Sequence, residues 1–526
     1  MEDVFETPLA ETIFKQRYSL RGEESWPQTC KRVTDAVGYE GPLLYMIERK
    51  YIPAGRYLHM AGKLYRAICN CYALRVEDSR EGWADYLYQL TLMLASGGGL
   101  SGEYSRVRGR GSEIRRTGGI ASGPVALMLA ADALGAQIRD GGNRRAALGA
   151  LLDWRHSDIE EFMSVKNWSE DYLELKRKDT NFHLPLEGTN ISIKYGDEFL
   201  KAIHNGDPRA QHIFGLNMFQ AMKTAEPGFS FNFGGKTDDL RNVCMEYSTP
   251  FSGDSCNLGT VFISRVKSLS EFESILREAV EFQIRGNIYT ESPTRLNYEV
   301  RRQSNSIGIG LGGIHEWLMQ RGYKYEVSQE LHRWLQVWKD VTDEHAEKVA
   351  KKLGVEIPRA KRACAPNGTI GMLAETTGGI EPLMSAAYRR AYMDGAVKKY
   401  QYVVDSVVRR LIMNGVYPHI IEDAYDIDFE RRVAFQAAIQ DYTDMAISST
   451  VNLPKWGSEK NNSELVKPYS DIVLRYATRL RGLTIYPDGA REGQPIERVP
   501  IHEAIGKEGV EYRYHETECK GGVCGI

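Results

Sequence analysis

The 526-residue chain contains no run of about 18 apolar residues, the length that a membrane-spanning helix needs. Its charge is nearly balanced, because 67 Lys and Arg residues oppose 70 Asp and Glu residues and leave a formal net charge of -3. We therefore expect neither nucleic acid nor a membrane as a partner. The first residues do not show the basic and then apolar order of a secretion signal. We expect a cytoplasmic protein, located in the host cytoplasm if a phage encodes it.

Cysteine is scarce, with 8 residues in the whole chain. This density excludes a disulfide-stabilised scaffold, and in a reducing compartment such cysteines are catalytic, redox-active, metal-binding or simply buried. Internal repeats and long low-complexity segments are absent, and 42% hydrophobic with 26% charged residues is the composition of a folded globular protein. Intrinsic disorder is thereby excluded for most of the chain. The spacing of the cysteines must decide among their possible roles.

Gly-rich turns alternate with apolar segments over most of the chain, which predicts an α/β protein with a mostly parallel sheet or barrel. Helices are predicted at residues 84–95 and 340–353, and short strands at residues 306–311 and 483–486. An apolar stripe over residues 403–412 predicts one further helix. We place a helical N-terminal region at residues 1–60, a catalytic domain at residues 61–490 and a flexible tail at residues 491–526.

The segment Asn242-Val243-Cys244-Met245-Glu246 is the first candidate for chemistry. If it is extended, residues i, i+2 and i+4 share one face, so an amide, a thiol and a carboxylate point the same way. An amide can hydrogen-bond a substrate hydroxyl, a carboxylate can act as a general base, and a thiol can be a nucleophile or a radical carrier. On spacing alone, the commoner arrangement of a buried cysteine beside surface polar groups is favoured.

The other notable cysteines are Cys71, Cys256 and the terminal pair Cys519 and Cys524. Two thiols separated by Lys-Gly-Gly-Val on a mobile tail can close a small disulfide, and the glycines let the tail enter a pocket and leave it. A metal clip and an incidental pair are the alternatives. Only His515 lies nearby as a further ligand, so we predict no metal site. The three remaining cysteines are predicted to be core or incidental residues: Cys30, Cys69 and Cys364.

Two Gly-rich turns have the composition of phosphate-binding segments. Pro366-Asn367-Gly368-Thr369-Ile370-Gly371 precedes an apolar helical run, so its backbone amides and its threonine can hold a phosphate at a helix N-terminus. The second turn, residues 308–313, matches the dinucleotide fingerprint GxGxxG. Residues 300–305 before it are too polar for the buried strand that a Rossmann unit requires, so a nicotinamide or flavin site is disfavoured there.

Taken in order along the chain, these motifs resemble the large catalytic subunit of ribonucleotide reductases. The motifs are Cys71, Asn242-x-Cys244-x-Glu246, Cys256-Asn257-Leu258-Gly259, residues 366–371 followed by Gly379-Ile380-Glu381-Pro382, and Cys519 with Cys524. No single motif is decisive, but five in the same order are highly specific, and they cover nearly the whole chain. The resemblance implies a ten-stranded α/β barrel with a central finger loop. It also implies an enzyme that makes deoxyribonucleotides from ribonucleotides for DNA synthesis.

The resemblance implies a role for each residue of the central motifs. Cys244 is expected to be the thiyl radical that abstracts the 3′ hydrogen of the ribose. Glu246 is expected to be the base on the 3′ hydroxyl, and Asn242 is expected to hydrogen-bond the substrate. Cys71 and Cys256 are expected to be the reducing pair, which forms a disulfide as the 2′ hydroxyl leaves as water.

Further sites are implied in the same way. The tail pair, Cys519 and Cys524, is expected to reduce the internal disulfide by exchange, served by a thioredoxin- or glutaredoxin-type reductant. Asn70 departs from the family, where serine is more usual. The implied substrate-binding residues are Asn70, Ser96, Gly97, Gly98, Pro366, Asn367, Gly368, Thr369 and Ile370. The implied binding residues for a deoxynucleotide effector are Asp78, Ser79, Arg144 and Arg145, at a site where two subunits of a homodimer meet.

The family divides by the source of its radical. Members that use a ferritin-like partner usually carry two adjacent tyrosines in the last barrel strand, whereas here Pro487 follows Tyr486. Cys256 follows Cys244 by 12 positions, a short interval that resembles the adenosylcobalamin-dependent class, so adenosylcobalamin is the expected cofactor. No DxHxxG cobalamin motif is present, as this class leads one to expect, and the glycyl-radical motif is missing.

Two alternatives stay open. One is a compact subunit without a cofactor of its own, which takes its radical from a metal-containing, ferritin-like small subunit. The other is a noncatalytic nucleotide-binding protein of the same fold, against which the intact set of site residues argues. The N-terminal region is too short for an ATP-cone domain, so we expect effectors to select the substrate and not to switch the enzyme off.

Overall fold

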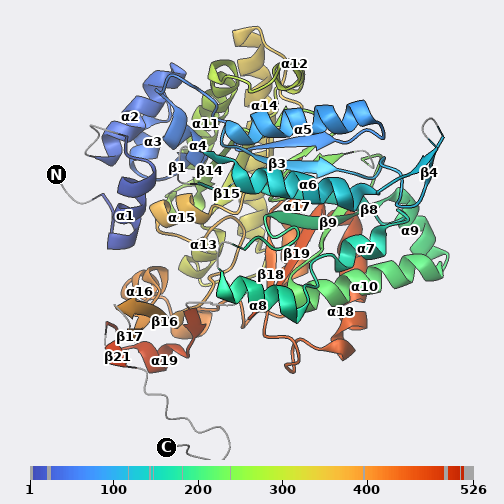
Figure 1. Cartoon of the computed structure of the whole chain (residues 1–526). Helices are drawn as coiled ribbons and strands as arrows, with labels where there is room; N and C mark the ends of the chain where they lie inside the picture. The colour runs from blue at the N-terminus through green and yellow to red at the C-terminus, as the bar shows by residue number, and fades with distance from the viewer. Residues whose placement is uncertain are drawn as a thin grey trace, which may run out of the picture.

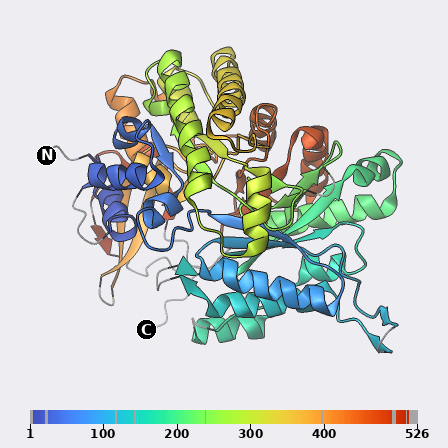
Figure 2. The same ribbon diagram turned by 90° about the horizontal axis from the view of Figure 1, so that it is seen from above.

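The structure is a computed structural model of the chain. It describes residues 4–20, 25–115, 118–140, 144–145, 147–179, 182–236, 239–394, 397–490, 496–509 and 511–513. Helices surround central sheets (Figure 1), and a second view shows the same layers from above (Figure 2). In both views the N-terminal helices lie on the same side of the molecule as the hairpin of β16 (Ala387–Asp394) and β17 (Val397–Val404). The helices of the described part are all too short or too polar to cross a membrane.

The largest sheet has eight strands in the order β13-β2-β3-β8-β9-β10-β19-β18. The strands β2, β3, β8, β9 and β10 are parallel, and β19 lies antiparallel to β10 and parallel to β18. Their residues are almost all buried, as expected for parallel strands covered on both faces. The bounds are β2 (Cys71–Arg75), β3 (Gly99–Glu103), β8 (Leu148–Asp153), β9 (Thr189–Gly196), β10 (Gly228–Asn232), β13 (Asp254–Ser255), β18 (Thr450–Leu453) and β19 (Gly482–Pro487).

A second sheet contains β1 (Tyr51–Pro53), β14 (Leu258–Phe262) and β15 (Gly308–Gly312), with β14 parallel to β15 and antiparallel to β1. Backbone contacts link it to the large sheet. Ile309 pairs with Arg362, and Cys364 pairs with Ile447, which lies shortly before β18 in the chain. At the other edge, β13 of the large sheet leads within three residues into β14. Backbone pairing therefore links β15 to the β18 side of the large sheet, and on the β13 side the link is the short chain connection to β14.

Most helices follow strands in the chain. In the first part, α5 contacts α6, and both lie along the same side of the large sheet (Figure 1). The N-terminal helices are α1 (Pro8–Arg17), α2 (Trp26–Val37), α3 (Leu43–Ile47) and α4 (Gly55–Met60). The next are α5 (Arg80–Ala95), α6 (Pro124–Gln137), α7 (Ile159–Ser164), α8 (Glu170–Lys178), α9 (Asp197–His204) and α10 (Pro208–Thr224). Those that remain are α11 (Leu269–Tyr289), α12 (Arg295–Ser304), α13 (Ile314–Gln320), α14 (Gln329–Leu353), α15 (Gly368–Ala374), α16 (Ser406–Met413), α17 (Phe429–Gln440), α18 (Val466–Tyr476) and α19 (Ile501–Ala504).

Two large hydrophobic clusters form the core. One fills the space between the parallel strands β2 to β10 and the helices that follow them. The other contains side chains of the second sheet, of α11 and α14, and of the N-terminal helices, among them Phe14 and Trp26. The N-terminal helices therefore share a core with the second sheet.

Four of the regular elements that the sequence predicts are present. The helix predicted at residues 84–95 is the C-terminal part of α5, and the helix at residues 340–353 is the end of α14. Gly354 closes α14 in the left-handed conformation, with φ of 66°. The strands predicted at residues 306–311 and 483–486 are β15 and β19. Because the GxGxxG segment forms the strand β15 itself, it does not make the turn of a dinucleotide site.

Two predictions in the last quarter of the chain are wrong. The stripe over residues 403–412 is not one helix, because β17 (Val397–Val404) ends inside it and α16 begins at Ser406. The carboxylate of Asp405 accepts a hydrogen bond from the Val407 amide at 2.8 Å and so starts the helix there. Apolar residues of the strand and of the helix face the same small core. In the sequence they follow one another with the spacing of a single amphipathic helix.

The predicted flexible tail also begins too early. Residues 496–513 include β20 (Ile496–Arg498), α19 and β21 (Glu511–Arg513), and these two strands flank β16 (Ala387–Asp394) and β17 in a four-stranded sheet. Ala504 of α19 is fully buried against this sheet and α16. A polar composition therefore does not mean disorder here, since backbone pairing and one small core suffice. Cys519 and Cys524 lie outside the described residues.

Candidate active site

The predicted Asn-x-Cys-x-Glu triplet lies in the loop of a short hairpin formed by β11 (Leu240–Arg241) and β12 (Ser248–Thr249). Its backbone is not extended. The Asn242 carbonyl accepts from the Met245 amide at 3.1 Å, which closes a tight turn, and Met245 has a φ of 72°. The Asn242 side chain accepts from the Tyr247 amide at 3.0 Å and donates to Glu246 Oε1 at 2.8 Å. A turn, and not a strand face, brings the amide and the carboxylate together.

The thiol of this turn is accessible while its neighbours are not. Cys244 is exposed, whereas Asn242 and Glu246 retain only 1% and 2% of their accessible surface. The loop thus presents one cysteine at its tip and buries the two polar side chains on either side of it.

Glycines of the surrounding strands lie against this loop, and the tightest approach is at Gly99. A Cβ atom on Gly99 of β3 would lie 3.2 Å from Val243 Cγ2, and one on Gly149 of β8 would lie 3.4 Å from the Val243 Cα atom. On the other side, a Cβ atom on Gly482 of β19 would lie 3.5 Å from Met245 Cβ. The loop is therefore held between β3 and β8 on one side and β19 on the other.

Glu246 is a buried carboxylate with an incomplete set of partners. Its Oε1 atom accepts from Asn242, but Oε2 is buried and has no hydrogen-bond partner among the described residues. Burial raises the pKa of Glu246 to about 7. A carboxyl group with this pKa exchanges a proton readily near neutral pH, which suits a general base.

Cys71 and Cys256 lie opposite each other on antiparallel backbone segments. The Cys256 amide donates to the Cys71 carbonyl at 3.0 Å, and the Cys71 amide donates to Cys256 Sγ at 3.1 Å. Directly opposed antiparallel residues have Cα atoms about 4.5 to 5.5 Å apart, within the range that a disulfide spans. Neither cysteine is in a disulfide. Burial, together with the neighbouring Cys71 and Glu246, raises the pKa of Cys256 well above 9.0. The Cys256 thiol is therefore protonated at neutral pH.

Cys71 and Cys256 lie close to the loop. Cys71 is the register partner of Gly99 on the adjacent strand, and a Cβ atom on Gly99 would lie 3.2 Å from Val243 Cγ2. Burial raises the pKa of Cys364 to about 12, and the Glu246 carboxylate contributes to that rise. Cys364 is a buried residue close to the site that sequence reasoning assigned only to the core. Cys30, Cys69 and Cys364 are all buried, as expected.

Four predicted substrate residues lie around the start of β2 and β3. The Asn70 backbone pairs with Cys256 and Gly99, while its Oδ1 atom is buried without a hydrogen-bond partner in the described part of the chain. Ser96 ends α5, and its hydroxyl donates to the Met93 carbonyl at 2.6 Å. Residues 97–98 form the turn into β3, where Gly97 has a φ of 86°. Asn70 is thus the polar group of this set with a vacant acceptor.

The predicted phosphate turn leads into α15. Asn367 precedes the helix in the left-handed conformation, with φ of 58°, and its Oδ1 atom accepts from Thr260 at 2.8 Å. Its Nδ2 atom is buried with no acceptor among the described residues. The Thr369 hydroxyl lies 2.5 Å from the Tyr18 hydroxyl, and both Pro366 and Gly368 are exposed. The following motif supports the turn, since a Cβ atom on Gly378 would lie 2.8 Å from the Pro366 carbonyl oxygen.

Two of the predicted effector residues, Asp78 and Ser79, lie at the N-terminus of α5. Ser79 caps this helix by accepting from the Gly82 amide at 2.9 Å. The Asp78 carboxylate accepts from Arg108 Nε at 2.8 Å, and this arginine, which sequence reasoning missed, also contacts the hairpin of β4 (Glu113–Ile114) and β5 (Gly119–Ile120). The other predicted effector residues, Arg144 and Arg145, form β7 (Arg144–Arg145), which pairs with β6 (Arg139–Asp140) in a hairpin. The side chains of residues 144 and 145 lie outside the described part.

At the end of β19, Tyr486 is followed by Pro487 instead of a second tyrosine. Tyr486 is half-buried, and Pro487 after it is buried and pairs with Leu453 of β18. The next residue, Asp488, accepts from the Tyr425 hydroxyl at 2.6 Å. The residue that follows Tyr486 is therefore a packed strand residue, Pro487, whose side chain is not redox-active.

Comparison with known proteins bears directly on this arrangement. Residues 69–225, 232–355 and 347–486 match the family described as ribonucleotide reductase, barrel domain. The vitamin B12-dependent ribonucleoside-diphosphate reductase of Mycobacterium tuberculosis (strain CDC 1551 / Oshkosh) is 25% identical over 98% of this chain and 83% of its own length. The protein of the same name from Thermoplasma acidophilum is 25% identical over 85% of this chain and 64% of its own. A putative adenosylcobalamin-dependent ribonucleoside-triphosphate reductase of Mycobacterium phage D29 is 24% identical over 86% of this chain and 76% of its own. The chain belongs to the ribonucleotide reductase family.

Proposed function

We propose that this chain is the catalytic subunit of an adenosylcobalamin-dependent ribonucleotide reductase. The observation that carries the proposal is the convergence of an exposed thiol, a buried carboxyl with a pKa of about 7 and a pair of opposed thiols. These groups supply a radical carrier, a base and a two-electron reductant, which together reduce a ribose at its 2′ carbon. The names of the relatives in Mycobacterium tuberculosis and Thermoplasma acidophilum support the same activity.

The two sheets are proposed to close into a ten-stranded barrel. Five parallel strands, β2, β3, β8, β9 and β10, make one half. The other half consists of β14, β15, the segment around residues 361–364, the segment running from residue 446 into β18, and β19. Hydrogen bonds from Ile309 to Lys361 (2.8 Å) and from Ser448 to Cys364 (2.9 Å) support this closure. The loop that bears Cys244 then enters the barrel as its finger loop.

The proposed reaction balances within the residues of this site. The Cys244 thiyl radical takes the 3′ hydrogen atom, and Glu246 takes the proton of the 3′ hydroxyl while Asn242 holds the substrate. The 2′ hydroxyl leaves as water, and Cys71 with Cys256 supplies two electrons and two protons as its S–S bond forms. Cys244 then returns its hydrogen atom to the 3′ carbon, and Glu246 returns its proton to the 3′ oxygen. Each turnover therefore yields one deoxyribonucleotide, one water and one disulfide.

The residues present fit adenosylcobalamin as the source of the radical. When bound, this cofactor supplies the one-electron chemistry that converts the Cys244 thiol to a radical. An exposed Cys244 is reachable from outside the loop, as direct contact with a cofactor requires. A relay through the chain from a ferritin-like partner needs redox-active side chains in succession, and Pro487 after Tyr486 interrupts it.

Three site residues each retain one buried polar atom without a protein partner in the described part of the chain: Asn70 Oδ1, Glu246 Oε2 and Asn367 Nδ2. Buried polar atoms in native proteins almost always have partners, so such atoms point to a ligand. We assign Asn70 and Glu246 to the ribose hydroxyls. Asn367, with the exposed backbone of Pro366 and Gly368 and with Thr369, is assigned to the substrate phosphates.

The remaining partners follow from the surface loops and from the tail. Asp78, Ser79 and Arg108 are proposed to contact a deoxynucleotide effector between two copies of the chain. Arg144 and Arg145 of the β6–β7 hairpin are proposed to take part in the same site. Cys519 and Cys524 are proposed to pass electrons from a thioredoxin- or glutaredoxin-type protein to the internal disulfide.

One assay tests the proposed function. Purified protein is incubated with each ribonucleoside diphosphate or triphosphate and dithiothreitol, with and without adenosylcobalamin. We expect deoxynucleotide formation only with adenosylcobalamin. Product that requires an added ferritin-like subunit would move the chain to the partner-dependent class, and no product under either condition would favour the noncatalytic alternative.

A further inference from the structure

Residues 6–18, here called the N-terminal segment, contact both ends of α15. The helices α1 and α15 lie against each other in the fold (Figure 1). Residues just before α1 bind the C-terminal end of α15, and Tyr18, just after α1, binds its N-terminal end. The proposed phosphate turn lies at the N-terminal end of α15. The segment therefore contacts the helix both at the proposed substrate site and at its opposite, C-terminal end.

At the far end, the carboxylate of Glu375 organises the contact. Its side chain is almost completely buried and accepts from the Glu6 amide at 3.0 Å and from the Thr7 amide at 2.6 Å. Amides that begin a helix have no acceptor within it, so Glu375 satisfies the start of α1. The same carboxylate forms an ion pair with Arg49. The end of one helix is therefore tied to the beginning of the other.

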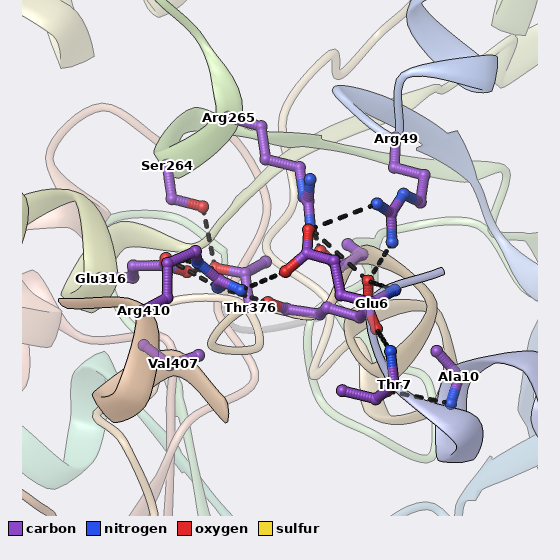
Figure 3. Close-up of polar contacts among 12 residues, drawn as sticks. Glu6, Thr7, Ala10, Arg49, Ser264, Arg265, Glu316, Thr376, Val407 and Arg410 are labelled. Carbon is purple, nitrogen blue, oxygen red and sulfur yellow. Dashed lines mark hydrogen bonds and ion pairs between the residues drawn. The ribbon is translucent and has the colours of Figure 1, made fainter. Parts of the chain in front are cut away.

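Three arginines surround this junction (Figure 3). Arg49, Arg265 and Arg410 each donate to one backbone carbonyl of residues 373–375, at 3.2, 2.6 and 2.7 Å respectively. They come from three different parts of the chain. Cations stabilise the C-terminal end of a helix, where the last carbonyls lack intrahelical donors. The end of α15 is thereby fixed to the body of the protein.

Glu6 completes the cluster from the N-terminal segment. Its carboxylate lies 3.2 Å from Arg265, 2.8 Å from Arg410 and 3.5 Å from Arg49. These contacts are among the dashed lines of Figure 3. The arginines lower the pKa of Glu6, so it is charged at neutral pH. The three arginines repel one another, and the Glu6 carboxylate between them offsets this repulsion. Glu6 thus clamps the segment onto the end of α15.

At the other end, Tyr18 acts on the proposed phosphate turn. The Tyr18 hydroxyl lies 2.5 Å from Thr369 Oγ1, and the tyrosine itself is buried. A threonine hydroxyl has one hydrogen to donate and two acceptor positions. If Tyr18 donates to Thr369, the threonine keeps its own hydrogen for a phosphate oxygen. The contact also fixes the rotamer of Thr369 before substrate arrives.

We propose that Tyr18 is a positioning residue of the substrate-phosphate site and that the Glu6 clamp holds the segment that carries it. This inference rests on the proposed function, since it takes residues 366–370 as the phosphate turn. Tyr18 orients the Thr369 hydroxyl toward the phosphate, and the clamp keeps α1 against α15. The N-terminal segment is thereby part of the substrate site, although it lies far from it in the sequence.

The test compares Tyr18→Phe, Thr369→Val and the double variant by steady-state kinetics and by direct nucleotide binding. We expect each single variant to raise KM by about two- to tenfold, the range for loss of one hydrogen bond, with kcat nearly unchanged. The double variant should be no worse than Thr369→Val, because both changes remove the same interaction. Tyr39→Phe is the matched control, since Tyr39 donates to Glu278 at 2.5 Å in the same N-terminal region but away from α15.

The outcomes separate the two proposals. If Thr369→Val raises KM but Tyr18→Phe does not, or if the effects of the two changes multiply, the positioning role is overturned and the phosphate turn stands. If Thr369→Val leaves KM unchanged, the phosphate turn is misassigned and the positioning role falls with it. A loss of melting temperature with unchanged KM in Tyr18→Phe would reveal a purely structural contact. Should Tyr18→Phe fail to fold, Glu6→Gln is expected to raise KM by a similar factor, and an unchanged KM in that variant would refute the clamp.

Discussion

Glu246 offers the sharpest test of the site, because its raised pKa affects both catalysis and stability. The carboxyl is buried, one of its oxygens has no partner among the described residues, and its pKa is raised from 4.5 to about 7. As a base it must be ionised. We therefore expect kcat/KM to rise tenfold per pH unit below 7 and to level off above it, so that activity at pH 5 is about one hundredth of the plateau.

The same shift predicts a change in stability. A carboxyl whose pKa is raised on folding weakens the fold as the pH rises from 4.5 to 7, because the folded state resists ionisation. A shift from 4.5 to about 7 corresponds to about 3 kcal/mol. Glu246→Gln keeps an oxygen for the hydrogen bond from Asn242 and removes the charge. Its stability relative to the wild type should therefore increase by up to about 3 kcal/mol between pH 4.5 and pH 8.

Both effects are measured on the same two proteins. Initial rates between pH 5 and pH 9 give the kinetic profile, and urea denaturation at pH 5 and pH 8 gives the relative stability. Glu246→Gln should lose turnover by about a hundredfold or more while it still binds nucleotide. A stability difference between wild type and variant that does not change with pH would refute the raised pKa. A pH-independent rate in the wild type would refute the role as base.

Other residues give predictions of their own. Cys244→Ser should abolish turnover and leave nucleotide binding intact, because the hydroxyl O–H bond is too strong for the radical step; substantial product in a deoxynucleotide assay would contradict the assignment. Gly149→Val should lower turnover by at least tenfold, because its side chain meets the loop at Val243; unchanged kcat in a correctly folded variant, judged by circular dichroism, would show that the loop does not depend on this space. Cys519→Ser and Cys524→Ser should stop turnover with thioredoxin but spare it with dithiothreitol, and equal loss with both reductants would exclude a shuttle. Adding dATP at high concentration should change which base is reduced in mixed-substrate assays, and unchanged product ratios across all four deoxynucleotide effectors would contradict the effector site.

The sequence predicted several features that depend only on local order. The regular elements α5, α14, β15 and β19 were predictable, because capping residues and apolar periodicity act over a few positions. The order of the motifs along the chain was sufficient to indicate the family. That Pro487 follows Tyr486 can likewise be read from the sequence, and this pair bears on the radical source independently of the fold.

Local patterns failed where two elements share one core. The stripe at residues 403–412 combines a strand and a helix, and only the Asp405 cap separates them. Residues 496–513 are polar, yet they pair with a hairpin that precedes them in the chain by about a hundred positions. Pairing between distant segments carries no local signature, so neither feature was predictable.

The sequence by itself determined which reactive groups the protein carries: a thiol between an amide and a carboxylate, two further cysteines and a Gly-rich turn. Only the tertiary structure decided how these groups act on one another. It brings Cys71 and Cys256 together from 185 positions apart and turns the Asn242 side chain onto Glu246. Burial raises the pKa of Glu246, and strand glycines lie against the loop that presents Cys244. The physical reason is that chemical identity belongs to each residue, whereas burial, register and electrostatic environment depend on segments that are distant in the chain and are packed together by the fold.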